Sequence, residues 1–288
     1  MRADLHVHSS ASDGTDPPAE VMARAARAGL DVVALTDHDT VAGHAEARQV
    51  LAGSVLAGSV LAGSLTLLPG MELSCRLAGR SMHLLAYVFD AGQPDLAAEL
   101  SRIRDDRVLR ARAMVDRLAD LGVDISWDQV AAIAGPAVVG RPHIARAMAA
   151  SGAIASPREA FTQDWIADGG RAYVGRYALD PVRAIGLVRA AGGVAALAHP
   201  RAGRDTLVSD EQIAGLAAAG LAGLEVFHPD QSGTERAGLL ALAHDLGLVA
   251  TGGSDDHGSL TGHRLGAETV DAEAYHALLA RVPAAPPG

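Results

Sequence analysis

The sequence predicts an α/β protein in which parallel strands alternate with outer helices and a helical subdomain is inserted. Three observations support this prediction. Short apolar runs alternate with amphipathic segments over most of the chain, which is the rhythm of βαβ units in a barrel or an open sheet. The middle of the chain shows helical patterns and no convincing strand. The length of 288 residues suits one large domain that carries an insertion.

The first part of the chain alternates expected strands with helices. Pro17–Gly29 is predicted to be a helix because prolines stand at its start and a glycine ends it. A second helical pattern begins at Val41. The expected strands of this part are Arg2–His8, Asp31–Thr36, Leu65–Leu68, Met71–Cys75 and His83–Phe89.

The segment that begins at Pro94 is expected to be helical. Leu96–Leu121 has the pattern of one long helix. Ser126–Gln129 and Ser156–Glu159 have the spacing of capping boxes, so each is expected to open a further helix. The predicted division is residues 1–93 for the first part of the barrel, 94–175 for the inserted helical subdomain and 176–288 for the second part of the barrel.

After this segment the α/β alternation resumes. The expected helices are Pro181–Ala191, Asp210–Gly220 and Thr234–Gly247, and the expected strands are Val194–His199, Leu221–Phe227 and Leu248–Ser254.

A tandem repeat interrupts the first part. The pentapeptide VLAGS occurs three times from Val50 to Ser64. A five-residue period matches no solenoid class, so we interpret the repeat as a local expansion of a helix–strand connection and assign it no function.

The composition excludes several classes of protein. The chain has 24 basic and 34 acidic residues, a net charge of −10 and a pI of about 5.6, whereas duplex nucleic-acid binders carry a basic patch and a high pI. It contains no lysine, which excludes a Schiff-base lysine and a Walker A loop. Cys75 is the single cysteine, so no internal disulfide forms. With no signal-like start and no apolar span, we expect a cytoplasmic protein with no membrane or duplex DNA partner.

Histidine and aspartate side chains recur where predicted strands end. His6 and His8 are two residues apart on the first strand, so both side chains project to the same face. The α/β folds place their sites at this end of the strands, and paired imidazoles suit transition-metal ions. A set of unrelated polar strand ends would not account for the repetition. The same placement recurs with Asp37, His38 and Asp39, with His199, and with Asp255 and His257.

Three further residues extend this set. Glu72 follows Pro69-Gly70, His83 lies on the next expected strand, and Asp13 lies in the loop after His8. On its own, Glu72 is more typical of a solvated carboxylate at a strand edge, and Asp13 suits a turn or an N-cap equally well.

These motifs occur in a fixed order along the chain. They are DLHVHSSASDG at Asp4–Gly14, LTDHDT at Leu35–Thr40, GMELS at Gly70–Ser74, His83, LAHP at Leu197–Pro200 and GSDDH at Gly253–His257. The set resembles the PHP (polymerase and histidinol phosphatase) family of metal-dependent phosphoesterases, and the resemblance covers essentially the whole chain. GRPHIARAM at Gly140–Met148 also resembles the helical insertion of a nucleotide-phosphatase subgroup.

The resemblance implies a distorted (β/α)7 barrel with three divalent metal ions at the C-terminal ends of its strands. Mn²⁺ is favoured, and Fe²⁺ or Zn²⁺ also suit mixed imidazole and carboxylate ligands. Asp4 and Asp37 are candidates for orienting the imidazoles, although a buried carboxylate bonded to backbone N–H groups is an equal alternative for each. The implied ligand sets are His6, His8, Glu72 and Asp255 for one ion, Glu72, His83 and His199 for the second, and Asp13, His38 and His257 for the third.

The implied activity is hydrolysis of a phosphoric monoester. The expected substrates are nucleoside 3′,5′-bisphosphates, AMP and short 5′-phosphorylated RNA. Paired ions lower the pKa of a bridging water from 15.7 towards about 7, and the resulting hydroxide attacks phosphorus. Histidinol-phosphate phosphatase and a non-catalytic metal-binding module are the rival interpretations. The GRPHIA-bearing insertion argues against the first and the complete ligand set against the second.

Without lysine, arginine side chains or backbone N–H groups must hold the phosphate. Arg141 and His143 stand at an expected helix start, where backbone amides also favour anions. Arg176 lies just before the chain re-enters the barrel, and Arg201 follows His199. For each arginine an ordinary surface position is the alternative.

Overall fold

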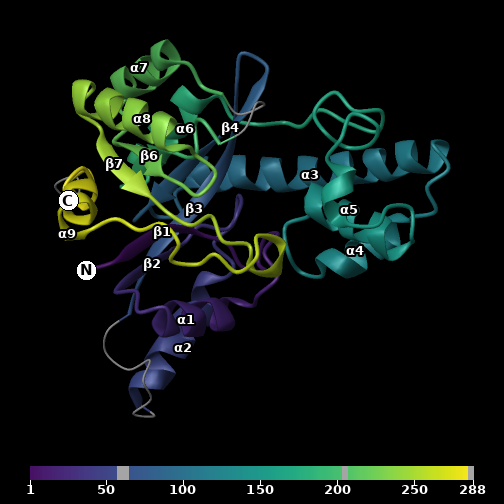
Figure 1. The fold of residues 1–288 in the computed structure, drawn as a ribbon, viewed down its shortest axis with the longest axis horizontal. Helices are drawn as coiled ribbons and strands as arrows, with labels where there is room; N and C mark the ends of the chain where they lie inside the picture. Colours follow the sequence, from purple (N-terminus) through teal and green to yellow (C-terminus); the bar gives the residue numbers. More distant parts are fainter. Residues whose placement is uncertain (57–64, 203–206, 285–288) are drawn as a thin grey trace. The chain divides into compact units, whose positions relative to one another are not determined.

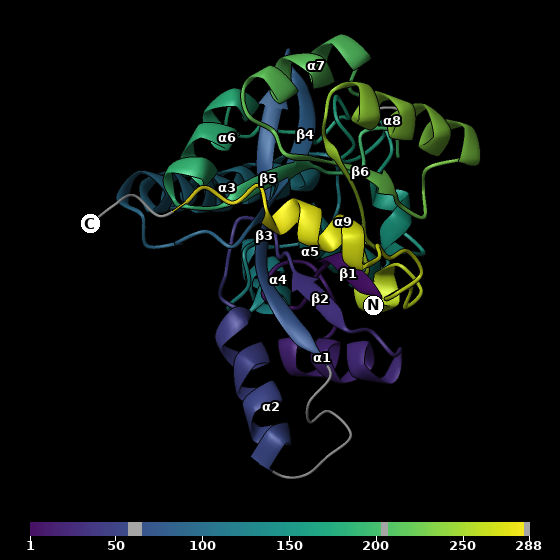
Figure 2. The same cartoon turned by 90° about the vertical axis from the view of Figure 1, so that its left-hand side faces the viewer.

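Seven strands form one sheet in chain order (Figures 1 and 2). The computed structural model describes residues 1–56, 65–202 and 207–284. A parallel bridge between Val7 and Asp256 joins β1 to the segment after β7, so the sheet nearly closes into the predicted barrel. The strands are β1 (Ala3–Val7), β2 (Val32–Leu35), β3 (Thr66–Leu77), β4 (Arg80–Tyr87), β5 (Val194–Leu197), β6 (Gly223–Phe227) and β7 (Val249–Gly252).

The pairing of the central strands differs from the prediction. The two strands expected on either side of Pro69-Gly70 are one strand, β3, which pairs antiparallel with β4, and β4 pairs antiparallel with β5. Ala78 and Gly79 join β3 to β4 with φ of 49° and 82°, the backbone of a tight hairpin. A connection of two residues is too short for the crossover that parallel pairing needs. The expectation of an entirely parallel sheet was therefore wrong at β4.

The strands are buried on both faces, which explains their continuous apolar sequences. In β2, Val32 and Ala34 join a core cluster with members from β1, β4, β5 and β7, whereas Val33 and Leu35 join a cluster formed with α1 and α2. Tyr87 is fully buried in the first cluster, and its hydroxyl donates to the Leu5 carbonyl at 2.9 Å. The two-residue period thus directs alternate side chains to the barrel interior and to the helices outside it.

The helices of the barrel unit follow the strands along the chain. Their first turns begin as the sequence indicates, with Pro18 at the start of α1 and a capping box between Ser232 and Glu235 at α8. The C-terminal α9 is an additional helix that packs beside β7. The bounds are α1 (Pro18–Arg27), α2 (His44–Leu56), α6 (Pro181–Ala190), α7 (Asp210–Ala218), α8 (Gly233–Asp245), η3 (Gly258–Leu260) and α9 (Ala272–Leu279).

Residues Glu99–Ala178 form a separate compact unit, and Met1–Ala98 with Leu179–Gly288 form the barrel unit. The helical unit has its own core, with Met114, Leu118 and Ile144 fully buried. Its helices are α3 (Pro94–Asp120), which begins in the barrel unit, α4 (Trp127–Ala134), α5 (Arg141–Ala150) and the 3₁₀ helix η1 (Pro157–Ala160). The domain boundaries placed at residues 94 and 175 stay a prediction.

The two capping-box motifs behave differently. At α4 the Ser126 hydroxyl accepts from the Gln129 N–H and the box is complete. At Ser156 the hydroxyl instead donates to Glu159, and only the short helix η1 follows, so the expectation of a full helix there was wrong.

The VLAGS repeat begins within α2, and its residues 57–64 lie outside the described residues. Its interpretation as an expanded connection stays a prediction. Within the described part of the chain, no helix is both long and apolar enough to cross a membrane.

Candidate metal centre

The fold of the barrel unit brings all nine predicted ligands together. They form four overlapping groups of three or four residues in which the ligand atoms lie within 4.8 Å of one another. Glu72 lies within β3 and His83 within β4, so the antiparallel hairpin of these two strands supplies both residues. The groups are His8, Asp13, His38 and His257; His6, Glu72 and His199; His6, His8 and Asp255; and His38, Glu72 and His83.

Glu72 lies at the middle of the centre. Its Oε1 is 2.8 Å from Nδ1 of His83 and 3.0 Å from Nε2 of His199. Its Oε2 is 3.3 Å from Nε2 of His6 and 3.1 Å from Nε2 of His8. The two carboxylate oxygens therefore face two different pairs of imidazoles, which is the arrangement of a carboxylate shared by two cations.

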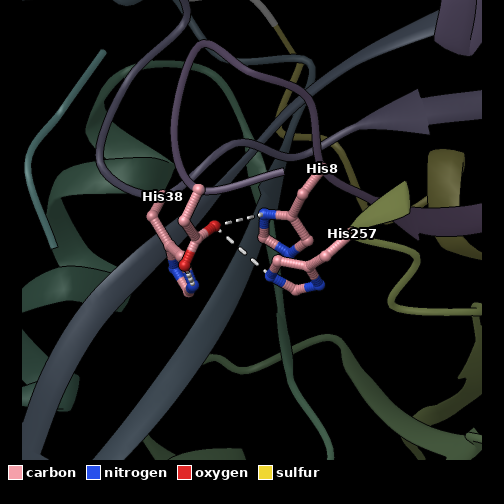
Figure 3. Close-up of side chains that lie close together, drawn as sticks. His8, His38 and His257 are labelled. Carbon is pink, nitrogen blue, oxygen red and sulfur yellow. Dashed lines mark ion pairs between the residues drawn. The ribbon is translucent and has the colours of Figure 1, made fainter. Parts of the chain in front are cut away.

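Asp13 is the centre of another group. His8, His38 and His257 point towards one another around it (Figure 3). Asp13 Oδ1 is 3.3 Å from Nε2 of His257, and its Oδ2 is 3.7 Å from Nε2 of His38. His8 offers Nε2 to the group of His6 and Asp255 and faces Asp13 with Nδ1 at 4.0 Å, so it lies between the two groups.

Unusual backbone conformations aim two of these side chains. His199 and Asp255 have φ of 26° and 48°, a left-handed region that costs non-glycine residues free energy and that clusters at functional sites. Tertiary hydrogen bonds hold both residues, because the Asp255 N–H donates to the His6 carbonyl at 2.8 Å and the His199 N–H donates to Glu225 at 2.7 Å. A Cβ on Gly253 would lie 2.4 Å from Cβ of His6, so this close approach of β7 to β1 requires glycine.

Burial is graded across the centre. The side chains of His6, His8 and Glu72 are at most 1% exposed, whereas those of His38, His83 and His257 are 14–18% exposed. The side chains of Asp13, His199 and Asp255 are 12–17% exposed, so solvent reaches the centre past six of its nine predicted ligands.

Charge is strongly coupled within this buried cluster. Burial by itself would raise the pKa of Glu72, but His38 and His83 beside it hold that pKa well below its usual range. Burial lowers the pKa of His38 to about 3. Burial also acts to lower the pKa of His8, but Asp255 and Glu72 raise it to about 10. The buried carboxylates and imidazoles of this cluster therefore shift one another's pKa values.

The donor set fits divalent transition-metal ions. Nε2 of His6 and Nε2 of His8 lie 3.1 Å apart, and two facing ring nitrogens can share only one hydrogen. Nδ1 of His8 is buried and has no hydrogen-bond partner among the described residues. A cation between these atoms would satisfy the lone pairs, and the mixture of imidazole nitrogen and carboxylate oxygen suits Mn²⁺, Fe²⁺ or Zn²⁺.

The two carboxylates expected to orient the imidazoles hold loops instead. Asp4 accepts from the N–H groups of Ser254 at 2.9 Å and Gly266 at 2.8 Å. Asp37 accepts from the Ser9 N–H and from the hydroxyl groups of Ser9 and Ser12. Asp4 therefore corresponds to the alternative that was left open, a buried carboxylate bonded to backbone N–H groups, whereas Asp37 bonds to one N–H group and to two hydroxyl groups.

Glu225 of β6 and His228 just after this strand are two polar residues that the sequence did not single out as ligands. Glu225 Oε1 lies 3.0 Å from Nδ1 of His6. His228 is 1% exposed, and its Nε2 lies 3.3 Å from Asp255 Oδ2. A signal for Glu225 was present, since a carboxylate inside the apolar strand GLEVF must be paired to be buried.

Arg264 is a further residue that the sequence did not point to. Its guanidinium donates to Asp255 Oδ2 at 3.3 Å and to Asp230 at 2.9 Å. Arg201, by contrast, pairs with Asp210 at the start of α7.

The remaining predicted contacts lie in the helical unit. Arg141 donates to Asp168 at 2.6 Å, and Nδ1 of His143 accepts from the Gly140 N–H at 3.0 Å, which caps α5. Burial and the positive charges of Arg141 and Arg176 lower the pKa of Arg110 to about 9. Sequence reasoning missed Arg110, whose presence gives this unit a local concentration of positive charge.

Comparisons with known proteins identify relatives of this chain. Residues 4–91 match the family model described as the PHP domain. The chain is 33% identical to a 3′,5′-nucleoside bisphosphate phosphatase of Chromobacterium violaceum, with 93% of this chain and 91% of that protein covered. It is 33% identical to a 5′-3′ exoribonuclease of Haemophilus influenzae, with 88% and 89% covered. The crystal structure of a candidate metal-dependent phosphoesterase from Bifidobacterium adolescentis matches with a TM-score of 0.88 at 34% identity, covering 98% of this chain and 96% of that one.

Proposed function

The chain belongs to the PHP domain family, and on this premise we propose that it is a metal-dependent phosphohydrolase that releases phosphate from nucleotides. The proposed substrates are nucleoside 3′,5′-bisphosphates, AMP-like nucleotides and short 5′-phosphorylated RNA. The name of the relative from Chromobacterium violaceum supports the nucleoside bisphosphates, and that of the relative from Haemophilus influenzae supports the RNA.

The observation that carries this proposal is the placement of Glu72 among the histidines. One of its oxygens faces His83 and His199, and the other faces His6 and His8. We assign these residues, with Asp255, Asp13, His38 and His257, as ligands of a multinuclear centre. Bound divalent ions would neutralise the phosphoryl oxygens and activate a water molecule for attack on phosphorus.

The chain's own residues prepare this chemistry. His6, His8 and Glu72 close the centre from behind and exclude water there, while the more exposed His38, His83 and His257 leave a side open to substrate. For phosphate contacts we keep Arg141, His143, Arg176 and Arg201 as proposals. The lowered pKa of Arg110 supports an anion-binding role for the helical unit, because an anion would offset the repulsion among its guanidinium groups.

The test is phosphate release from adenosine 3′,5′-bisphosphate by Mn²⁺-loaded protein, with a chelator-treated sample as control. AMP, a short 5′-phosphorylated RNA and histidinol phosphate are assayed in parallel. Metal-dependent release from the nucleotides supports the proposal. Release from histidinol phosphate alone would replace the substrate class, and no release from a metal-loaded sample would reject the activity.

Glu72→Gln tests the shared ligand. Removing one partner of a buried charge cluster costs roughly 3–5 kcal/mol, and a loss of that size in transition-state stabilisation lowers kcat/KM by about 10²- to 10⁴-fold. Glu273→Gln on the exposed face of α9 is the matched control and should leave kcat/KM unchanged. Unchanged turnover of Glu72→Gln with its full metal content would contradict the role of Glu72 as a shared ligand.

A further inference from the structure

The strand β6 contributes none of the nine assigned ligands, yet its Glu225 touches two of them. The residue is fully buried, and each of its carboxylate oxygens accepts one hydrogen bond. Oε1 pairs with Nδ1 of His6 at 3.0 Å, and Oε2 accepts from the backbone N–H of His199 at 2.7 Å.

The first bond decides which nitrogen of His6 faces the centre. A carboxylate oxygen can only accept, so Nδ1 of His6 must carry a hydrogen. In the neutral ring Nε2 then has a free lone pair, and this atom lies 3.3 Å from Glu72 Oε2 and 3.4 Å from Asp255 Oδ1. The tautomer that can bind a cation at this point is the one that Glu225 selects.

The second bond acts on the backbone of His199. This residue has a φ of 26°, which an L-residue keeps only when its surroundings hold it there. With the N–H held by Glu225, Nε2 of His199 lies 3.0 Å from Glu72 Oε1. His6 and His199 belong to one potential ligand group together with Glu72, so a single carboxylate sets the geometry of two members of that group.

We propose that Glu225 is a positioning residue of the metal centre, which holds His6 in its Nδ1–H tautomer and fixes the backbone of His199 so that both present Nε2 to the ions. This inference rests on the metal centre of the proposed function. Partners of this kind typically contribute about 10- to 100-fold to metal affinity.

Glu225→Gln is a sharp test because the amide has only one accepting oxygen. The backbone N–H of His199 cannot change its polarity, whereas the ring of His6 can move its hydrogen. The glutamine should therefore turn its oxygen to His199 and its NH₂ to Nδ1 of His6, which places the ring hydrogen on Nε2. The substitution keeps the volume of the side chain but removes His6 as a ligand.

Asp4→Asn is the matched control. Asp4 is also a fully buried carboxylate and lies on β1, but its partners are the backbone N–H groups of His6, Ser254 and Gly266, not an imidazole. A general disturbance of buried hydrogen bonds would affect both variants alike.

Binding of Zn²⁺ and Mn²⁺ is titrated by calorimetry and counted by elemental analysis, and the imidazole ¹⁵N spectrum of the Zn²⁺-loaded protein reports the tautomer of His6. We expect about 10- to 100-fold weaker binding in Glu225→Gln for the ions that involve His6, retained binding at Asp13, His38 and His257, and near-normal binding in Asp4→Asn. Equal affinities in Glu225→Gln and the wild type would overturn the proposal.

The wild type provides a test that does not depend on a variant folding. In the Zn²⁺-loaded wild type, a hydrogen on Nδ1 of His6 supports the proposal and a hydrogen on Nε2 overturns it. A wild type that binds no ions would instead reject the metal centre of the proposed function, so the two failures are distinguishable.

Discussion

The raised pKa of Asp4 predicts how the stability of the protein without bound metal ions depends on pH. Its side chain is fully buried, and burial raises its pKa from 3.8 to about 6, even though the N–H groups of Ser254 and Gly266 bond to it. In the unfolded chain the pKa returns to its ordinary value. Between about pH 4 and pH 6 the folded state therefore holds a proton that the unfolded state has released.

The sign follows from linkage. Stability falls as pH rises wherever the folded state binds more protons, so Asp4 lowers the free energy of unfolding across this window. Each pH unit in the window corresponds to about 1.4 kcal/mol, which gives about 3 kcal/mol in all. The contribution is neutral below about pH 4 and fully unfavourable above about pH 6.

Asp4→Asn isolates this contribution, because other titrating groups cancel when the variant is compared with the wild type. Urea unfolding of both proteins in chelator at intervals from pH 3.5 to pH 7 gives the two free energies. We expect the variant to gain about 3 kcal/mol relative to the wild type between pH 4 and pH 7. A difference that stays constant with pH, or that changes in the opposite direction, would refute the reasoning.

Other predictions follow from the same structure. His8, whose pKa is raised to about 10, must lose a proton when an ion binds at pH 7, so the heat of metal binding should depend on the ionisation enthalpy of the buffer, and a buffer-independent heat would contradict this. The buried thiol of Cys75 should react with a thiol reagent only after unfolding, and fast reaction of the native protein would show that the core is open. Ser126→Ala should destabilise the helical unit by about 1 kcal/mol because the cap of α4 is lost. Ile144→Ala should destabilise it by about 2–5 kcal/mol because a cavity forms in its core. Urea unfolding measures both effects, and unchanged unfolding midpoints would contradict them.

Much of the fold could be predicted because its signals are local. Apolar runs such as DVVALT form buried strands, and the prolines and capping residues at the starts of α1 and α4 mark helix starts within a few residues of the structure. The antiparallel position of β4 could not be predicted in the same way. Pairing direction depends on which strand lies beside which, and the short hairpin at Ala78 and Gly79 decided it.

The nine assigned ligands were also predicted from the sequence, because strand ends that carry paired histidine and aspartate at two-residue spacing are a local pattern and their order resembles a known family. The resemblance also implied a division of these ligands among three ions, and that division stays a proposal. His8 lies between two groups, and the two oxygens of Glu72 face different pairs of histidines, which only the folded positions of β1, β3 and β4 determine.

By itself, then, the sequence determined the fold class, the strand ends that carry the site and the chemistry of their side chains, since each of these depends on neighbouring residues in the chain. Only the tertiary structure decided the hydrogen-bond partners of the buried carboxylates around the ligands. Asp4 and Asp37 bond to N–H and hydroxyl groups of loops, while Glu225, 219 positions after His6, bonds to its imidazole. Spacing along a chain predicts which side chains share a face of one strand, but the partner of a buried side chain depends on the register between strands, which is fixed when the barrel closes.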